Sequence, residues 1–187
     1  CGDKMAVLNR PKIWLHHLLS PIISRIAPVK WKEWNEMYYW NKRKGAEGTL
    51  RNTHYKRYYT EFFEIEEAFY ENKSILDIGC GPRGSLEWAT MATERIGLDP
   101  LAEQYLKMGA HEHKMEYVTA NSEAMPFSDN HFDVICSFNS LDHVANLDDT
   151  IAEIKRVAKT GGIFLLITDL NHPVTATATG VLMGCAR

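Results

Sequence analysis

The chain has 187 residues, of which 45% are hydrophobic, 24% are charged and 11% are aromatic, and this composition excludes disordered, collagen-like and coiled-coil proteins. Its length is that of one domain that can bury a sizeable core. The net charge of −3 is unevenly distributed, because residues 1–60 contain 12 Lys and Arg against 4 Asp and Glu, whereas residues 61–187 contain 9 against 20. A basic front and an acidic body suggest two functional parts.

The first part of the chain is predicted to be mainly helical. Apolar residues recur at helical spacing in residues 12–26, and residues 30–43, which are dense in tryptophan and tyrosine, predict a second helix. Residues 60–71 predict an amphipathic helix with Thr60 as its N-cap and its phenylalanines facing inward. We therefore expect residues 1–59 to form a helical, basic and aromatic cap on the remainder of the chain.

From residue 74 onward, short apolar runs alternate with helical stretches, which predicts parallel β-α-β units. The predicted strands are residues 74–78, 95–98, 116–119, 133–138 and 163–168. The predicted helices between them are residues 84–93, 101–108 and 148–158. We therefore expect residues 60–187 to form an open α/β sheet whose ligands bind at the carboxyl ends of the strands.

The most informative stretch is residues 75–84 (ILDIGCGPRG), where a predicted buried strand runs into a glycine turn. Glycines allow the backbone to turn tightly and to approach a ligand closely. Asp99 ends the next predicted strand, where a carboxylate can accept hydrogen bonds from the ribose of an adenosine cofactor. The G-x-G-x-x-G spacing also matches the dinucleotide fingerprint, so an NAD-dependent oxidoreductase is a rival interpretation. Asp77 opposes that rival, because a carboxylate there repels a pyrophosphate and favours a cationic ligand such as a sulfonium.

Four stretches resemble, in order, motifs of the class I S-adenosylmethionine-dependent methyltransferases of the small-molecule group called type 11. They are residues 76–81 (LDIGCG), 97–99 (GLD), 121–127 (NSEAMPF) and 137–144 (SFNSLDHV). The resemblance covers about residues 60–170. It implies a Rossmann-like parallel sheet in the order 3-2-1-4-5, S-adenosylmethionine as cofactor, and methyl transfer to a small-molecule oxygen, carbon or nitrogen acceptor.

The same resemblance implies the residues of the cofactor site. Gly79 and Gly81 would lie against the methionine part, with Asp77 near its amino group, and Asp99 would hold the ribose. Asn121 stands where the family often has an aspartate that contacts the adenine amino group, and its amide oxygen can still accept a hydrogen bond. The full implied set is Asp77, Gly79, Cys80, Gly81, Asp99, Pro100, Asn121, Ser122, Glu123 and Asn139.

His143, which follows the fourth predicted strand, is the leading candidate for a catalytic residue. A neutral imidazole can take a proton from an acceptor hydroxyl, and Asp142 could orient it or act instead. The alternative is that His143 only caps or packs the following helix. Methyl transfer also proceeds without a base when the reactants are aligned, since alignment lowers a barrier by roughly 7–11 kcal/mol.

The basic, aromatic residues 30–59 have two interpretations. They form a lid for an aromatic or anionic acceptor, or they form a helix that packs on the sheet and exposes a basic face. Nucleic-acid binding is not expected, because no known binding module is present. A metal site is not expected either, because the pair of histidines in residues 111–113 has no further ligand at a suitable spacing.

The ends of the chain and its cysteines complete the sequence expectations. Members of the resembling family continue with a sixth and a seventh strand, but only 18 residues follow Asp169, and the chain begins at Cys1. We therefore expect a truncated product or a domain completed by another chain, and a non-catalytic cofactor-binding fragment is a further interpretation. The four cysteines form no C-x-x-C pair, which favours a reducing, cytoplasmic location. The sequence contains no run of 18 apolar residues, so no membrane-spanning helix is predicted.

Overall fold

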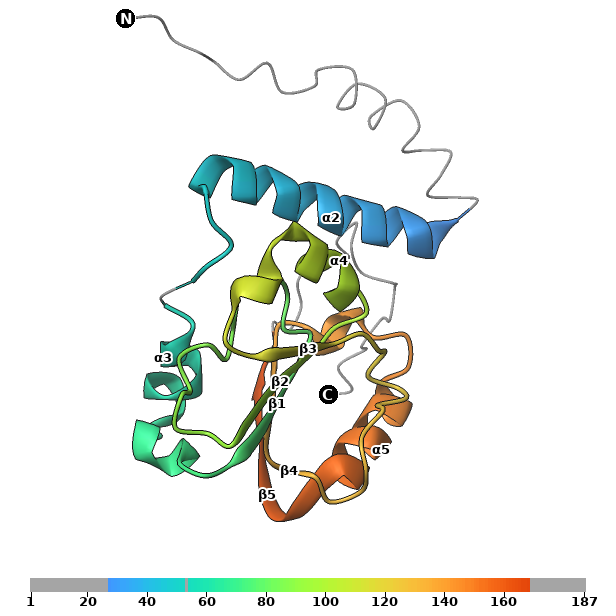
Figure 1. Ribbon diagram of the computed structural model, residues 1–187. Coiled ribbons are helices and arrows are strands. Elements are labelled where there is room, and N and C mark those ends of the chain that lie inside the picture. The colour runs from blue at the N-terminus through green and yellow to red at the C-terminus, as the bar shows by residue number, and fades with distance from the viewer. Residues whose placement is uncertain (1–26, 53, 169–187) are drawn as a thin grey trace, which may run out of the picture.

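The computed structural model describes residues 27–52 and 54–168, and the predicted helix over 12–26 lies outside them. The described residues form a five-stranded parallel sheet in the order β3-β2-β1-β4-β5, which confirms the expected topology (Figure 1). The strands are β1 (Ser74–Ile78), β2 (Glu94–Leu98), β3 (Glu116–Val118), β4 (Phe132–Phe138) and β5 (Ala158–Ile167). Since all five strands run the same way, their carboxyl ends meet at one edge of the sheet.

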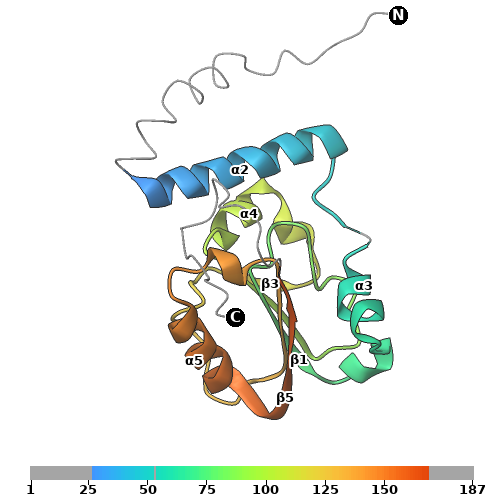
Figure 2. The ribbon, with the colours of Figure 1, turned by 180° about the vertical axis from the view of Figure 1, so that it is seen from behind.

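The helices surround this sheet, and the longest one crosses its edge. They are α2 (Pro28–Glu47), α3 (Lys56–Tyr59), α4 (Ala102–Met108) and α5 (Leu147–Val157). Short 3-10 turns occur at Glu61–Phe63, Glu67–Tyr70, Ala110–Glu112 and Leu141–His143. Both views show α2 lying across the molecule above α4, with α3 and α5 on opposite sides of the sheet (Figures 1 and 2). Among the described residues, no helix is both long and apolar enough to cross a membrane.

Apolar side chains cover both faces of the sheet, and β1 is therefore buried along its whole length. Alternate residues of a strand point to opposite faces of the sheet, so Leu76 and Ile75 contribute to different apolar clusters. One cluster packs against Ile154 and Val157 of α5, and the other packs against Tyr59 of α3. The predicted continuous apolar runs are thus strands that are covered on both faces.

The predicted helix over residues 60–71 is wrong. Glu64 adopts a left-handed conformation with φ 56° between two 3-10 turns, and Thr60 ends α3 rather than capping a new helix. Phe62 is 61% exposed, whereas Tyr70 is completely buried. Packing of buried tyrosines on the sheet therefore decides the backbone here, rather than the helical spacing of the apolar residues.

The predicted helix over residues 84–93 is also wrong, because this segment consists of turns. Its backbone bonds span three residues, as in Glu87 N–H to Gly84 and Ala89 N–H to Leu86. Ser85 is buried, and its hydroxyl donates a hydrogen bond to the Asp77 carboxylate. This tertiary contact holds the chain in turns where sequence spacing alone favours a helix.

Candidate functional site

The loop after β1 lies at the carboxyl edge of the sheet and is shaped by glycine. Gly79 and Gly81 have positive φ angles of 71° and 59°, which only glycine adopts without strain. The Gly79 N–H donates a 2.8 Å hydrogen bond to the Leu98 carbonyl at the end of β2. On the other side, a Cβ placed on Gly79 would lie 2.3 Å from the Cβ of Ser140 in the loop after β4. The glycine loop thus lies between the end of β2 and the loop after β4, the two strands that flank β1 in the sheet.

Replacing Gly79 by alanine should lower the free energy of unfolding by about 2 kcal/mol more than the same change at Gly161. Both glycines have positive φ angles, but a Cβ at Gly161 has no atom within 4 Å. The comparison therefore separates the clash with Ser140 from the backbone strain, which costs about 1–2 kcal/mol in each variant. Thermal and urea unfolding measure the difference, and equal losses in the two variants would show that Ser140 yields freely.

Asp77 is a buried carboxylate at the end of β1, and only 3% of its surface is exposed. The Tyr59 hydroxyl donates a 2.9 Å hydrogen bond to its Oδ2, and Ser85 donates another. Burial raises the pKa of Asp77 to about 6, against the opposing effect of these two hydrogen bonds. The group is therefore poised to become fully charged when a cation lies beside it.

Asp99 follows β2 directly and is 6% exposed. Its two oxygens accept hydrogen bonds from the Gly81 N–H at 3.2 Å and from the Leu101 N–H at 2.9 Å. Burial and, to a smaller degree, the charge of the neighbouring Glu36 carboxylate raise the pKa of Asp99 to about 7. The structure therefore brings Asp99 to the glycine loop, as the sequence predicts, and adds a second carboxylate from α2 that the sequence analysis did not identify.

The other residues of the predicted cofactor set lie at the same edge with different exposures. Asn139 has a left-handed φ of 52° directly after β4 and is exposed, as are Pro100 and Asn121. Cys80 is buried, and burial raises the pKa of its thiol. Exposed polar groups at strand ends are available to a ligand, whereas the Cys80 thiol is kept neutral.

Ser122 and Glu123 have side chains that are engaged within the protein. The Ser122 hydroxyl lies 3.1 Å from the Thr150 hydroxyl of α5. The Glu123 carboxylate accepts hydrogen bonds from the N–H groups of Ala145 at 2.7 Å and Asn146 at 3.1 Å. These contacts hold the loop before α5, so only the backbone of this segment is free to face a ligand.

His143 and Asp142 lie in the turn after β4, with His143 Nε2 3.5 Å from Asp142 Oδ2. Both side chains are partly exposed. Lys32 of α2 donates a 3.1 Å hydrogen bond from Nζ to the His143 carbonyl. Burial lowers the pKa of Lys32, and the carboxylates of Glu36, Asp142 and Glu123 partly offset this effect. The turn that carries the predicted catalytic residues is thus attached to α2.

Helix α2 lies in the segment that the sequence analysis interpreted as a lid or a packed helix, and it brings residues to the site that were not in the predicted cofactor set. Glu36 accepts hydrogen bonds from the Tyr105 hydroxyl at 2.6 Å and from Trp40 Nε1 at 3.4 Å. The Trp40 ring lies 3.7 Å from the position of a Cβ on Gly81. Lys44 donates a hydrogen bond to the Met108 carbonyl at the end of α4. A signal for these residues exists in the sequence, because Lys32, Glu36, Trp40 and Lys44 are spaced four apart, so that each is a neighbour of the next on the helix surface and the four form one winding stripe.

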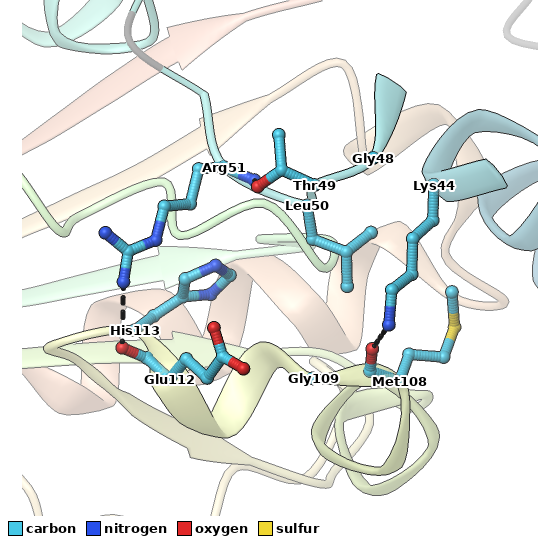
Figure 3. A pocket seen from close by; sticks show the side chains of 9 residues that line it. All are labelled: Lys44, Gly48, Thr49, Leu50, Arg51, Met108, Gly109, Glu112 and His113. Atoms are coloured by element: carbon cyan, nitrogen blue, oxygen red, sulfur yellow. Dashed lines mark hydrogen bonds between the residues drawn. The ribbon is translucent and has the colours of Figure 1, made fainter. Parts of the chain in front are cut away.

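A cavity of about 110 Å³ lies beside the C-terminal end of α2 (Figure 3). Arg51 spans its wall with a 3.4 Å hydrogen bond to the Glu112 carbonyl. None of the residues that line this cavity belongs to the predicted cofactor set; they are Lys44, Gly48, Thr49, Leu50, Arg51, Met108, Gly109, Glu112 and His113. The cavity adjoins the glycine loop at one point, because a Cβ on Gly84 would lie 3.0 Å from the His113 ring.

The two histidines considered for a metal have other partners. His111 lies 2.9 Å from the Leu106 carbonyl, and His113 lies 2.8 Å from the Tyr117 hydroxyl, each through Nδ1. His111 lies in the 3-10 turn Ala110–Glu112, and His113 follows this turn directly. Within residues 27–52 and 54–168, no three His, Cys, Asp or Glu side chains are grouped so that they could hold a metal ion.

The chain matches one family model, and many known proteins are similar to a part of it. Residues 76–166 match the model of a methyltransferase domain. A sterol 4-C-methyltransferase of Caenorhabditis elegans is 36% identical over 104 residues, which are 51% of this chain and 31% of that protein. A ubiquinone/menaquinone biosynthesis C-methyltransferase of Shewanella pealeana is 38% identical over 88 residues, which are 43% of this chain and 35% of that protein. The chain thus spans about a third of the length of these relatives.

Among solved structures, a protein described as a putative methyltransferase from Bacillus halodurans is 23% identical, with a TM-score of 0.48. The match covers 60% of this chain and 49% of that chain.

Proposed function

Because residues 76–166 match a methyltransferase domain, we propose that this chain is a class I S-adenosylmethionine-dependent methyltransferase that transfers the cofactor's methyl group to a small-molecule oxygen, carbon or nitrogen acceptor. The observation that carries the proposal is the pair of buried carboxylates, Asp77 at the end of β1 and Asp99 after β2, beside a loop that turns at Gly79 and Gly81. A ligand that is cationic at one end and has ribose hydroxyls at the other fits this donor set. The residues present therefore suit S-adenosylmethionine.

In this proposal, each part of the cofactor has its own protein group. Asp77 takes the ammonium group, Asp99 accepts hydrogen bonds from the ribose hydroxyls, and Asn121 accepts one from the adenine amino group. When bound, the cofactor supplies a methyl group on an electrophilic sulfonium. The protein's contribution is to align that group with the acceptor and to exclude water from the carboxyl edge of the sheet.

The acceptor side is assigned to the turn after β4. His143 would take a proton from an acceptor that carries a hydroxyl, with Asp142 beside it to orient the imidazole. Two of the relatives are named for methylating carbon on sterols and in quinone biosynthesis. The exposed rings of Trp34 and Tyr39 on α2 are compatible with an acceptor of this apolar kind. The free, buried thiols of Cys80 and Cys136 support a reducing, cytoplasmic location.

Calorimetric titration of the purified chain with S-adenosylhomocysteine and, separately, with NAD tests the cofactor. We expect micromolar binding of S-adenosylhomocysteine and none of NAD, because the two buried carboxylates repel a pyrophosphate. Binding of NAD alone would support the rival oxidoreductase and reject the methyltransferase. Transfer of labelled methyl to sterol, quinone and phenol acceptors then separates an enzyme from a non-catalytic binding fragment.

A further inference from the structure

Arg83 is a buried cation within the glycine loop, and only 9% of its surface is exposed. Its Nη2 forms an ion pair with Oε2 of Glu47 in the last turn of α2. Its guanidinium carbon lies 5.8 Å from the centre of the Trp40 ring. Among the described residues, no group accepts a hydrogen bond from its buried Nε. A guanidinium has five donors and is always charged, so a buried one with an unused donor has capacity for a further anion.

Arg83 shares its ion-pair partner Glu47 with a second cation, Arg43. Burial lowers the pKa of Arg83, and the nearby Arg43 lowers it further. Asp77 and Asp99 are the two buried carboxylates beside the same loop. The loop thus has a buried cation as well as two buried carboxylates beside it, so it offers both charges to a zwitterionic ligand.

We propose that Arg83 binds the α-carboxylate of the cofactor's amino-acid tail, while Asp77 binds the ammonium group of the same tail. The proposal rests on the proposed function, since it concerns the same cofactor. An arginine fork matches a carboxylate in geometry and forms stronger hydrogen bonds with it than a neutral donor does. Glu47 then has the role of holding the guanidinium in place and of neutralising it in the cofactor-free protein.

The other cations near the loop are less suited to this role. The Arg43 side chain is 48% exposed, and its Nε lies 3.1 Å from Glu47. Lys44 is bonded to the Met108 carbonyl, and Lys32 is bonded to the His143 carbonyl beyond β4. Arg83 is thus the cation in this region that is both buried and part of the glycine loop.

The test compares S-adenosylhomocysteine with 5′-methylthioadenosine, which keeps the nucleoside and sulfur but lacks the amino-acid tail. In Arg83→Met, we expect the affinity for S-adenosylhomocysteine to fall about 10- to 100-fold, while that for 5′-methylthioadenosine changes less than about twofold. Arg95→Met is the matched control, because Arg95 is a partly buried arginine at the start of β2, at the other end of that strand from Asp99. Equal losses for the two ligands in Arg83→Met, or no loss, would overturn the proposal.

A second variant decides the question where Arg83→Met does not fold. Glu47→Gln removes the charge that neutralises Arg83, so we expect the preference for S-adenosylhomocysteine over 5′-methylthioadenosine to rise about threefold or more. An unchanged or lower preference would then overturn the proposal. If the unchanged protein binds both ligands equally tightly, the tail has no partner and this inference fails, although the proposed function stands. If it binds neither ligand, the proposed function itself fails.

Discussion

Asp99→Ala should weaken the binding of S-adenosylhomocysteine about 1000-fold. The carboxylate at the end of β2 would accept two hydrogen bonds from ribose hydroxyls, and each hydrogen bond to a charged group is worth about 1.5–3 kcal/mol. Its burial makes the loss larger than at the surface, because water cannot replace the missing oxygens. Calorimetry with the purified variant measures the dissociation constant.

Two further variants sharpen this result. Asp99→Asn keeps one oxygen that can accept a hydrogen bond, so its loss should be smaller than that of Asp99→Ala. Asp129→Ala is the control, since this aspartate is exposed and pairs with Arg156 rather than with the glycine loop. The Gly81 and Leu101 N–H groups lose an acceptor in Asp99→Ala, so thermal unfolding must show that the variant remains folded. A change of less than threefold in folded Asp99→Ala would contradict the assignment of Asp99 to the ribose.

The affinity for S-adenosylmethionine should fall about 100-fold between pH 8 and pH 5.5. In the cofactor-free protein the pKa values of Asp77 and Asp99 are about 6 and about 7, so both carboxylates take up protons over this range. A cofactor with a sulfonium and an ammonium group favours their charged forms, and its binding must therefore release protons. Titration in buffers with different ionisation enthalpies measures that release near pH 6.5. A dissociation constant that is flat from pH 8 to 5.5 would exclude this coupling.

Asp77 and Asp99 also determine the direction in which the stability of the cofactor-free protein changes with pH. Both carboxylates have a pKa in the folded chain above the ordinary value of about 3.9, so the folded state binds more protons than the unfolded state between about pH 4 and pH 7. Their contribution to the free energy of unfolding is therefore fully present below pH 4 and decreases as the pH rises through 7. S-adenosylhomocysteine should restore stability at pH 8 by binding the charged forms.

The parts of the fold that the sequence predicts well are those set by local pattern. The strand that contains Asp77, the glycine turn and the position of Asp99 after the next strand follow from short apolar runs and from glycine chemistry. The strand order is confirmed as well. These features depend on residues that are close in sequence or on general rules of parallel sheets.

The parts that the sequence does not predict are set by contacts between distant residues. The turns over residues 84–93 depend on Ser85 reaching Asp77, and the break at Glu64 depends on tyrosines packing on the sheet. Glu36 and Trp40 enter the site only because α2 crosses the carboxyl edge of the strands, and no spacing within α2 states where the helix will lie. The pattern of residues along a helix identifies which side chains share a face, but it does not identify the element against which that face packs.

The four-residue spacing on α2 makes this helix sensitive to its own length. From Lys32, at the loop after β4, to Lys44, at the end of α4, the stripe spans about 18 Å at 1.5 Å per residue. One residue added between them would rotate the far half by about 100° and turn either the Lys32 end or the Lys44 end away from its partner. Substitutions on the solvent side of α2 leave the stripe in place. The helix should therefore tolerate substitutions on its solvent side far better than insertions or deletions, because only a change of length displaces one of its two attached ends.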